Sequence, residues 1–490
     1  MSRVVVIGAG VGGLSAAVLL AAAGHDVVVH ERSTVAGGKL AVYERDGFRF
    51  DTGPSLLTLP QVFEDLDLAL PLQPLDPVMR HVFPDGTVLD STSDRLVFSE
   101  RIASSCGPGA AADWSHFWRR AERIWAASWR SVLQRPIRPT TLAALSWRVD
   151  DLATIAPARS LHTLGRRYLR DRRLRMMLDR YATYTGADPR RAPAALAAIP
   201  YAELAFGAWY LPGGLGTLAS ALAARCGALG VPIELSSAVT GIHVTDSRVS
   251  GVRLATGRLV PADVVVSNVD ALTTYRDLLP TAQRLDRLAD RSLAGFVLLL
   301  GVRGTTPALA HHTVFFPRNY GAEFDAVFGS AGQRARPASD PAIFVTRAAD
   351  PAVHPPGTEA WFVLVNAPRH GTSWSAVDWS RPGLAEAYRD HVLGLLAARG
   401  LDVRDRLMFA EVRTPRDLAD ATGTPGGAIY GTAGGLLRPA NRGPVDGLWL
   451  VGGSTHPGGG LPMVTLSAKI VAEAIGPATP TPPPRSWSCG

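Results

Sequence analysis

Residues 4–31 read VVVIGAGVGGLSAAVLLAAAGHDVVVHE, and this stretch decides the fold. A β-branched run at 4–7 is followed by a helical pattern over 13–23 and a second β-branched run at 27–31. Apolar runs of this kind are typical of parallel strands that are buried on both faces. Because two parallel strands need a crossover between them, the pattern predicts a βαβ unit. We therefore expect an α/β fold with a Rossmann-type domain.

The glycines between the first strand and the helix match G-x-G-x-x-G through Gly8, Gly10 and Gly13, with Gly12 added. In this motif the first glycine makes a tight turn and the second lets the backbone approach a pyrophosphate. The third lets the helix pack on the strand while its N-terminus faces the phosphates. Glu31 ends the second strand, where a carboxylate accepts hydrogen bonds from an adenosine ribose. Glycine-rich segments near an N-terminus also arise by chance. The strand before the motif, the helix after it and the acidic Glu31 together predict a dinucleotide-binding site.

Composition limits the classes of protein that remain. The 490 residues suffice for two or three domains, and 47% hydrophobic with 19% charged residues excludes a disordered chain. The net charge is +7, carried almost entirely by arginine, which favours an anionic partner. No zinc-ligand spacing or recognition-helix signature accompanies the charge, so we expect a membrane surface and no nucleic acid.

Three widely spaced cysteines, Cys106, Cys226 and Cys489, predict neither a disulfide framework nor a metal site. A reducing, cytoplasmic location is the simpler interpretation. Residues 4–24 carry no charge, as in a signal peptide or a spanning helix, but the four glycines at 8–13 interrupt the run. We therefore interpret this segment as part of the folded domain.

Changes in pattern along the chain predict three parts and a tail. Helical patterns rich in arginine and aromatic residues indicate an inserted helical region, and short β-branched runs, including 239–244, 249–254 and 263–267, indicate a small sheet appended to the nucleotide-binding core. The Pro-rich end predicts disorder. The expected parts are a discontinuous cofactor domain (1–75, 205–275 and 430–476), a mixed-sheet substrate domain (76–112 and 276–429), a helical, membrane-facing region (113–204) and a disordered tail (477–490).

Three further stretches carry a family resemblance. They are ERSTVAGGK at 31–39, DTGPS at 51–55 and GLWLVGGSTHPGGGLPMV at 447–464. Together with the first glycine motif they resemble the phytoene desaturase branch of the flavin amine oxidase superfamily, over residues 4–475. At the far end, a strand that meets a glycine-rich turn and a helix N-terminus can approach a polar ring edge and stabilise charge on a reduced flavin.

The resemblance implies FAD as the cofactor. A lysine, Lys39, stands where the family has an arginine, which keeps the charge and loses the bidentate fork. The resemblance implies that Val239 lies against the adenine. An ordinary buried valine in a strand is an equally good interpretation of this residue. The implied cofactor-binding residues are Gly8, Gly10, Gly12, Gly13, Glu31, Arg32, Gly38, Lys39, Gly53, Pro54, Ser55, Val239, Gly452, Gly453, Pro462, Met463 and Val464.

Within the branch, RYATYTG at 180–186, VNAP at 365–368 and LPM at 461–463 look most like carotenoid 3,4-desaturases of hydroxylated or methoxylated acyclic carotenoids. The implied reaction introduces a C=C bond, with oxygen or a quinone as the final electron acceptor. Phytoene desaturase and a non-catalytic isoprenoid escort protein are the alternatives. An amine oxidase would need an aromatic sandwich in front of the flavin, and an NAD dehydrogenase would leave the later motifs without a role.

Trp114, Trp118, Trp125 and Trp129 share one face of a predicted helix whose opposite face carries arginines, and a second arginine-rich stretch spans 159–175. Core packing is the common reason for such a stripe, and a solvated face is the common reason for such a charge run. With a water-insoluble substrate, we expect peripheral binding at the inner face of the cell membrane.

No catalytic triad, metal cluster or pair of catalytic carboxylates can be recognised, so the catalytic groups stay unassigned and the cofactor would carry the chemistry. Tyr181, Tyr184 and His81 are candidates to line the reacting end of the substrate. A buried tyrosine, or a strand histidine bonded to backbone, is the simpler interpretation of each.

Overall fold

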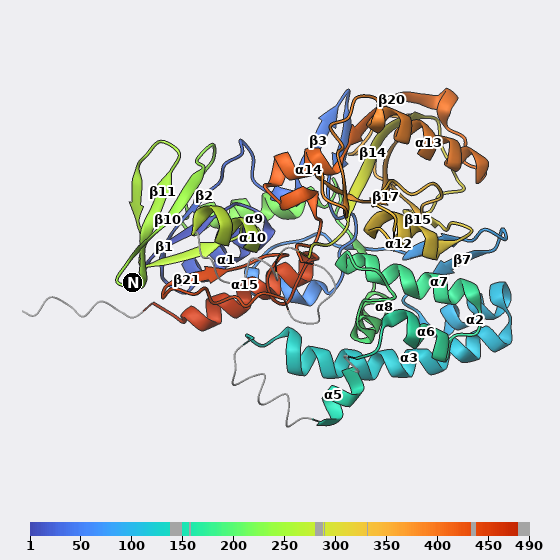
Figure 1. Ribbon diagram of the computed structural model, residues 1–490, viewed down its shortest axis with the longest axis horizontal. Helices are drawn as coiled ribbons and strands as arrows, with labels where there is room; N and C mark the ends of the chain where they lie inside the picture. The colour runs from blue at the N-terminus through green and yellow to red at the C-terminus, as the bar shows by residue number, and fades with distance from the viewer. Residues whose placement is uncertain are drawn as a thin grey trace, which may run out of the picture.

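The computed structural model describes residues 1–137, 149–155, 158–279, 288, 290–330, 332–432 and 438–478. In Figure 1 three parts are visible: strands around β1 at the left, a second sheet at the upper right, and a group of helices at the lower right. From residue 479 on, the predicted tail lies outside the described residues.

The part at the left is built on a parallel sheet in the order β21-β13-β1-β2-β9. Two helices pack together beside this sheet, α1 (Val11–Ala22) and α15 (Leu461–Ile475). The predicted βαβ unit is therefore confirmed, within two residues at each boundary. The strands are β1 (Arg3–Ile7), β2 (Asp26–His30), β9 (Ile233–Glu234), β13 (Val264–Ser267) and β21 (Leu448–Leu450).

Both faces of this sheet are buried, as the apolar runs predict. Val4 and Val6 pack toward the helices, whereas Val5 and Ile7 pack toward a three-stranded antiparallel sheet on the other face. The strand predicted at 263–267 lies between β1 and β21, so its placement in the small appended sheet was wrong. The small sheet consists of β10 (Val239–Thr245), β11 (Arg248–Leu254) and β12 (Leu259–Pro261).

The part at the upper right is a seven-stranded mixed sheet in the order β20-β14-β17-β16-β15-β6-β7, in which only β15 and β6 pair in parallel. One face packs against α13 (Leu384–Ala398). The other face is turned toward the rest of the molecule. The strands are β6 (Met79–Val82), β7 (Val88–Ser91), β14 (Ala294–Arg303), β15 (His312–Phe315), β16 (Ile343–Arg347), β17 (Thr358–Ala367) and β20 (Leu407–Arg413).

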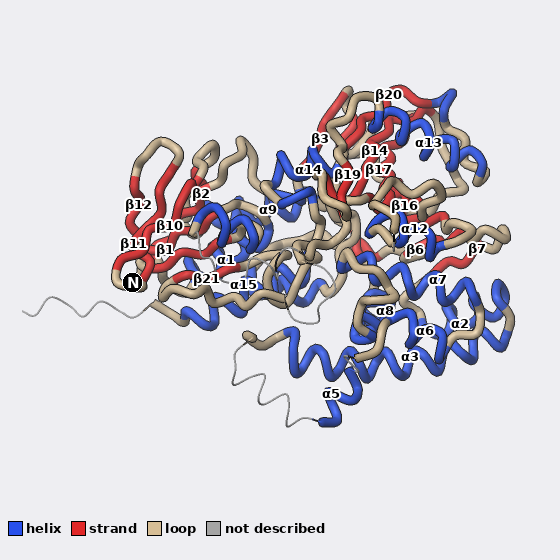
Figure 2. Tube along the Cα trace, in the orientation of Figure 1, coloured by secondary structure: helices blue, strands red, loops and turns tan. Residues whose placement is uncertain are grey.

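The helices at the lower right are drawn in blue in Figure 2, and they pack around one apolar cluster of side chains. None of the helices formed by the described residues is both long enough and apolar enough to cross a lipid bilayer. These helices are α2 (Arg95–Cys106), α3 (Pro108–Ser128), α5 (Val149–Ile155), α6 (Leu161–Tyr168), α7 (Arg172–Arg180) and α8 (Ala198–Phe206). The remaining named elements used below are α9 (Gly216–Ala228), α12 (Tyr320–Phe328), α14 (Pro415–Thr422), a 3-10 helix at Tyr181–Thr185 and a π-helical turn at Trp129–Leu133.

The tryptophan stripe of α3 faces the protein interior. Trp114 and Trp118 are buried in the cluster of the helical region, and Trp125 and Trp129 are half-buried and stacked at 4.8 Å between ring centroids. Trp114 and Trp118 are therefore core residues, which is the commoner reason for such a stripe. The exposed face of α3 carries arginines instead.

Candidate active site

The first glycine loop has the geometry that its sequence pattern predicts. Gly8 has a φ of +95°, which side chains disfavour, and it turns the chain from β1 into α1. A Cβ atom on Gly13 would lie 2.1 Å from the carbonyl oxygen of Gly8. Only glycine allows the helix to approach the strand so closely, and the N-terminus of α1 consequently lies at the end of the sheet.

The two ends of the chain meet at this loop. A Cβ atom on Gly12 would lie 3.1 Å from the Cα of Gly452, and α1 packs along α15. Asn268, which directly follows β13, lies between them: its amide nitrogen donates to the carbonyl of Val451 at 3.2 Å. A Cβ on Gly10, Gly12 or Gly452 would clash with this side chain. The two glycine segments, which belong to opposite ends of the chain, therefore lie against each other.

The second glycine pair extends the same surface. The Gly37 amide donates to the carbonyl of Ala9 at 2.9 Å, and a Cβ on Gly38 would lie 3.2 Å from the Cα of Gly10. A Cβ on Gly53 would lie 1.8 Å from the carbonyl oxygen of Lys39, so the chain crosses itself here. The first glycine loop, the second glycine pair and the C-terminal glycine loop thus come together and expose backbone without side chains. Such a surface suits a ligand that is bound by backbone N–H groups.

Glu31 braces the first loop from the end of β2. One carboxylate oxygen accepts from the Ala9 amide at 2.7 Å, and the other accepts from the Ser33 amide at 2.9 Å. The half-buried side chain therefore holds the glycine turn in shape. Its role as ribose acceptor stays a prediction.

Lys39 connects the second glycine pair to the C-terminal half. Its ammonium donates to the carbonyls of Ala428 at 3.1 Å and Ile429 at 2.6 Å. Burial lowers the pKa of Lys39 to about 8, although the nearby Asp270 carboxylate opposes that change. Asp270 itself forms a fully buried ion pair with Arg291 at 2.5 Å. The lysine thus anchors the segment that leads to Tyr430.

Tyr430 packs between two glycines. A Cβ on Gly459 would lie 2.4 Å from its ring, and a Cβ on Gly186 would lie 3.2 Å from it. Arg438 donates to the carbonyls of Tyr430 at 3.1 Å and Thr185 at 3.4 Å. These contacts join the C-terminal glycine loop to the helical region, and no sequence pattern pointed to them.

The C-terminal loop ends at the start of α15. Gly460 has a φ of +101°, and Pro462 occupies the first turn, where a missing N–H costs nothing. Met463 and Val464 follow in the same turn and are half-buried. A Cβ atom on Gly453 would lie 3.8 Å from the side chain of Val464. The N-termini of α1 and α15 therefore both face the joined glycine loops, and their dipoles favour negative charge there.

The other residues predicted for the cofactor site lie further apart. Arg32 is exposed and donates to the carbonyl of Asp420 at the end of α14, at 2.6 Å. Ser55, which follows Pro54, contacts the seven-stranded sheet: its hydroxyl accepts from Thr346 at 3.1 Å. Val239 is half-buried at the start of β10. Their contact with a cofactor stays a prediction.

His81 has the environment of a structural histidine. It is buried in β6, its Nδ1 lies 3.0 Å from the carbonyl of Leu89, and its ring stacks beside those of Phe83 and Phe316. Burial lowers the pKa of His81 to about 4, and the charge of Arg180 adds to that effect. The imidazole is therefore neutral near pH 7.

Tyr181 and Tyr184 belong to a polar group inside the helical region. The Tyr181 hydroxyl donates to Glu203 Oε1 at 2.7 Å, and Arg180 donates to the Tyr184 hydroxyl at 3.0 Å. The two tyrosine rings lie 5.2 Å apart. The sequence suggested the two tyrosines but gave no sign of Glu203, which lies on another helix.

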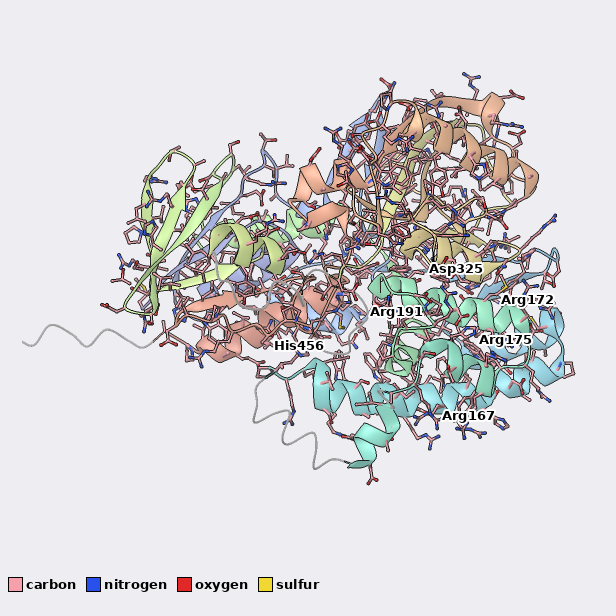
Figure 3. All side chains as sticks on the ribbon, viewed as in Figure 1. Arg167, Arg172, Arg175, Arg191, Asp325 and His456 are labelled. Carbon is pink, nitrogen blue, oxygen red and sulfur yellow. The ribbon has the colours of Figure 1, made fainter. Side chains whose placement is uncertain are left out.

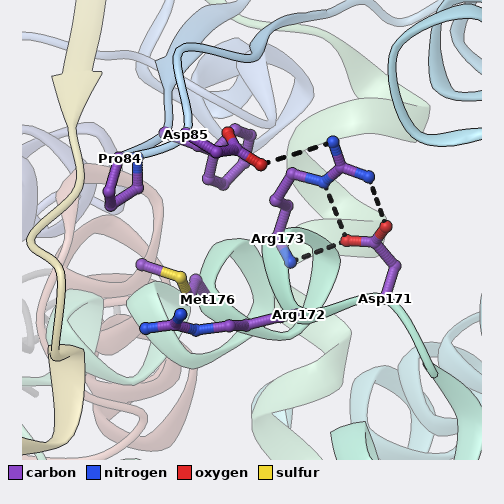
Figure 4. A pocket seen from close by; sticks show the side chains of 7 residues that line it. Pro84, Asp85, Asp171, Arg172, Arg173 and Met176 are labelled. Carbon is purple, nitrogen blue, oxygen red and sulfur yellow. Dashed lines mark hydrogen bonds and ion pairs between the residues drawn. The ribbon is translucent and has the colours of Figure 1, made fainter.

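Two surface pockets of the helical region have charged side chains in their lining and lie away from the glycine loops. One of about 290 Å³ lies beside α7, where Arg173 forms ion pairs with Asp171 at 2.7 Å and Asp85 at 3.6 Å (Figure 4). The other, of about 560 Å³, is lined by His116, Arg119, Glu122, Arg123 and Tyr168. Neither is lined by a residue of the glycine loops.

Comparisons with known proteins agree with this geometry. A family model described as flavin containing amine oxidoreductase matches residues 11–476. The chain is 34% identical to a 4,4'-diapolycopene oxygenase of Methylomonas sp, which spans 96% of this chain and 98% of that protein. It is 32% identical to a 4,4'-diaponeurosporene oxygenase of Staphylococcus aureus, with the same coverage, and 28% identical to a 1-hydroxycarotenoid 3,4-desaturase of Flavobacterium sp., over 97% of this chain and 99% of that one.

Solved structures share the fold at low sequence identity. An oxidoreductase from Methanosarcina mazei superimposes with a TM-score of 0.64 at 17% identity, covering 96% of this chain and all of that one. A putrescine oxidase variant gives a TM-score of 0.63 at 13% identity, covering 97% and 98% of the two chains.

Proposed function

This chain belongs to the family of flavin-containing amine oxidoreductases, and from that premise we propose that it desaturates an acyclic carotenoid. It is a flavin-dependent oxidoreductase. The proposed reaction is 3,4-desaturation of a 1-hydroxylated or methoxylated carotenoid. The observation that carries the proposal is the contact between Gly12 and Gly452, which joins the two flavin motifs in a chain whose relatives above are named for carotenoids.

The residues present fit FAD. The bare backbone at Gly10 and Gly38, together with the N-terminus of α1, suits the pyrophosphate. Glu31, at the end of β2, would accept a hydrogen bond from the ribose. Gly452 and the N-terminus of α15 suit the polar edge of the flavin ring. When bound, the flavin supplies the hydride acceptor for oxidation of an allylic C–H bond.

The protein's own part in the reaction would be positioning. A polyene that loses hydride stabilises positive charge by conjugation, so a modest proton acceptor suffices for the second hydrogen. Packing of Tyr430 between Gly186 and Gly459 would fix the boundary between the C-terminal glycine loop and the helical region. No residue is assigned as the proton acceptor.

Oxidation of a terminal methyl group is the second candidate. The two oxygenases are 34% and 32% identical to this chain, compared with 28% for the 3,4-desaturase. Both reactions act near the end of an acyclic polyene and begin at an allylic carbon. Phytoene desaturation and an escort role remain alternatives, although an escort has no need for Gly452 to contact the first glycine loop.

Peripheral membrane binding forms part of the proposal. Exposed arginines of the helical region, among them Arg119 and Arg123 on α3 and Arg166 and Arg167 on α6, would face anionic headgroups at the inner face of the cell membrane. Figure 3 shows Arg167 at the outer edge of this region. Such docking would let an apolar substrate enter from the bilayer, with oxygen or a quinone as the final electron acceptor.

The test is turnover by the purified holoenzyme of acyclic carotenoids with defined end groups. Desaturation removes two hydrogen atoms and shifts the absorption to longer wavelength, whereas methyl oxidation adds oxygen to the product, which mass spectrometry detects. If the flavin is bound and no carotenoid is changed under aerobic conditions or with a quinone, the proposal is wrong.

A further inference from the structure

A polar cluster lies buried where the helical region meets the seven-stranded sheet. Its members come from α7 and the 3-10 helix after it, from α8 and from α12, which lie side by side in Figure 1. Within it, Tyr181 donates to Glu203 at 2.7 Å and Arg180 donates to Tyr184 at 3.0 Å. We call this set the terminal cluster: Arg180, Tyr181, Tyr184, Glu203 and Tyr320.

The terminal cluster has hydrogen-bonding capacity that the protein leaves unused. Glu203 is 2% exposed and Tyr320 5%, yet neither Oε2 of Glu203 nor the Tyr320 hydroxyl has a hydrogen-bond partner among the described residues. A buried polar atom without a partner costs about 1–3 kcal/mol. Burial also raises the pKa of Glu203, although the hydrogen bond from Tyr181 opposes that change. A neutral Glu203 carboxyl could donate as well as accept.

Arg180 is a buried cation that faces aromatic rings. It is 9% exposed, and its guanidinium lies 5.2 Å from the ring centre of Tyr184 and 5.1 Å from that of Phe344. None of the ion pairs formed within the described part of the chain includes it. A guanidinium has five N–H donors, and the Tyr184 hydroxyl occupies one of them. Cation–π contacts stabilise the charge but leave those donors free for an oxygen acceptor.

The terminal cluster is close to the flavin-approaching loop. Burial raises the pKa of Tyr430, although the charge of Arg180 opposes that rise. The 3-10 helix that starts after Arg180 leads directly to Gly186, against which Tyr430 packs. At about 2 Å per residue this helix spans roughly 10 Å. Tyr184, Phe344 and Tyr430 remain only half-buried, although they lie between three parts of the molecule.

We propose that the terminal cluster binds the oxygen atom at one end of the polyene, and so selects substrates whose end carries a hydroxyl, methoxyl or carbonyl group. The inference rests on the proposed function and names the residues that would set its substrate range. Arg180 donates to the oxygen, and the free atoms of Glu203 and Tyr320 complete its hydrogen bonds. The surrounding cluster is apolar, so a hydrocarbon end would leave these groups unpaired.

Competition between two acyclic polyenes of the same carbon skeleton tests the inference. One ends in a hydrocarbon and the other carries a terminal hydroxyl. The holoenzyme should convert the hydroxylated polyene with a kcat/KM about 100-fold higher, because a site built to bond a hydroxyl rejects the analogue without it. Tyr320→Phe, which removes only the free hydroxyl, should lower this ratio about 10-fold, and Arg180→Met should lower it further. Arg180→Lys should not restore it.

Tyr388→Phe is the matched control, because the Tyr388 hydroxyl is buried in another cluster and already donates to the carbonyl of Ala338 at 3.1 Å. Its selectivity ratio should equal that of the wild type. Dissociation constants of both polyenes, measured by quenching of tryptophan fluorescence, give a readout that is independent of turnover. The affinity difference between the polyenes should shrink in Tyr320→Phe.

Equal conversion of both polyenes by the wild type would overturn the inference and leave the proposed function standing. A variant that slows both polyenes by the same factor would overturn it too, since the terminal cluster would then be structural. Conversion of neither polyene by a flavin-loaded enzyme would instead reject the proposed function. A preserved binding preference without turnover would still support the terminal cluster.

Discussion

Gly12 and Gly452 lie against each other, with 3.1 Å between the place of a Cβ atom on Gly12 and the Cα of Gly452, although they belong to opposite ends of the chain. Gly12 lies in the first turn of α1, which follows β1, and Gly452 lies in the loop that follows β21 of the same parallel sheet. Both glycines therefore lie at the carboxyl edge of this sheet, where ligands of α/β proteins bind. Their contact makes one site out of two sequence motifs.

Gly452→Val should impair flavin binding. Gly452 has a φ of +106°, and any side chain there would strain the backbone and collide with Asn268. We expect the purified variant to lose most of its flavin absorbance and to bind added FAD at least about 10-fold more weakly. Gly227→Ala, at a helical position where a Cβ meets nothing within 4 Å, should keep full flavin content. Equal flavin content in the two variants would contradict this assignment.

Arg291→Met should strongly destabilise the fold. It would leave the Asp270 carboxylate buried beside Lys39 without its ion-pair partner at 2.5 Å. Breaking a buried pair in this way costs about 3–5 kcal/mol. The exposed pair Arg442–Asp446 is the control, because Asp446→Asn should cost less than about 1 kcal/mol. Urea unfolding of both variants measures the difference, and equal midpoints would contradict the prediction.

Trp114→Ala should act on stability rather than on membrane binding. The ring is 4% exposed and packs edge-on against Phe98 at 5.4 Å. Removing such a side chain from a core costs about 3–5 kcal/mol of unfolding free energy. Thermal denaturation measures this loss. A variant with unchanged stability and weaker vesicle binding would show instead that the tryptophan contacts lipid.

Charge reversal on α3 tests the membrane proposal. Arg119→Glu with Arg123→Glu changes two exposed side chains and no buried one. Since each basic residue near an anionic surface contributes about 1 kcal/mol, the double variant should bind phosphatidylserine-containing vesicles at least about 10-fold more weakly. Arg258→Glu, exposed near the small sheet, should sediment with vesicles like the wild type. Unchanged sedimentation of the α3 variant would show that the exposed face of α3 does not bind the membrane.

Glu323→Gln should change how stability depends on pH. Burial raises the pKa of Glu323 to about 7 from 4.5, although hydrogen bonds from the Ala342 amide and Asn366 oppose the rise. The folded protein therefore holds this proton more tightly than the unfolded chain. The resulting stabilisation is complete below about pH 4.5 and is lost as pH rises through about 7.

Glutamine cannot ionise, so the wild type should lose stability relative to Glu323→Gln between these pH values, by on the order of 2–3 kcal/mol. Urea titrations of both proteins at several pH values measure the difference. A difference that stays constant with pH would show that Glu323 ionises as freely in the folded state as in the unfolded chain.

Local pattern was enough to predict the elements of the cofactor-binding part. The apolar run of β1, the glycine spacing and the helix after it each depend on neighbours in sequence, and the structure has them within two residues. The strand at 263–267 was recognised but assigned to the wrong sheet. Its residues are β-branched in either environment, so nothing local distinguishes a central parallel strand from an appended one.

The amino-acid sequence by itself determined the helices, the strands, the glycine turns and the family resemblance that these turns carry. The reason is that hydrophobic periodicity and backbone freedom are properties of residues adjacent in the chain. Only the tertiary structure decided that Asn268 lies between two glycine loops, that Trp114 is buried, and that Tyr181 donates to Glu203 on another helix. Such meetings depend on strand order and helix packing, which bring together residues that no spacing in the chain relates.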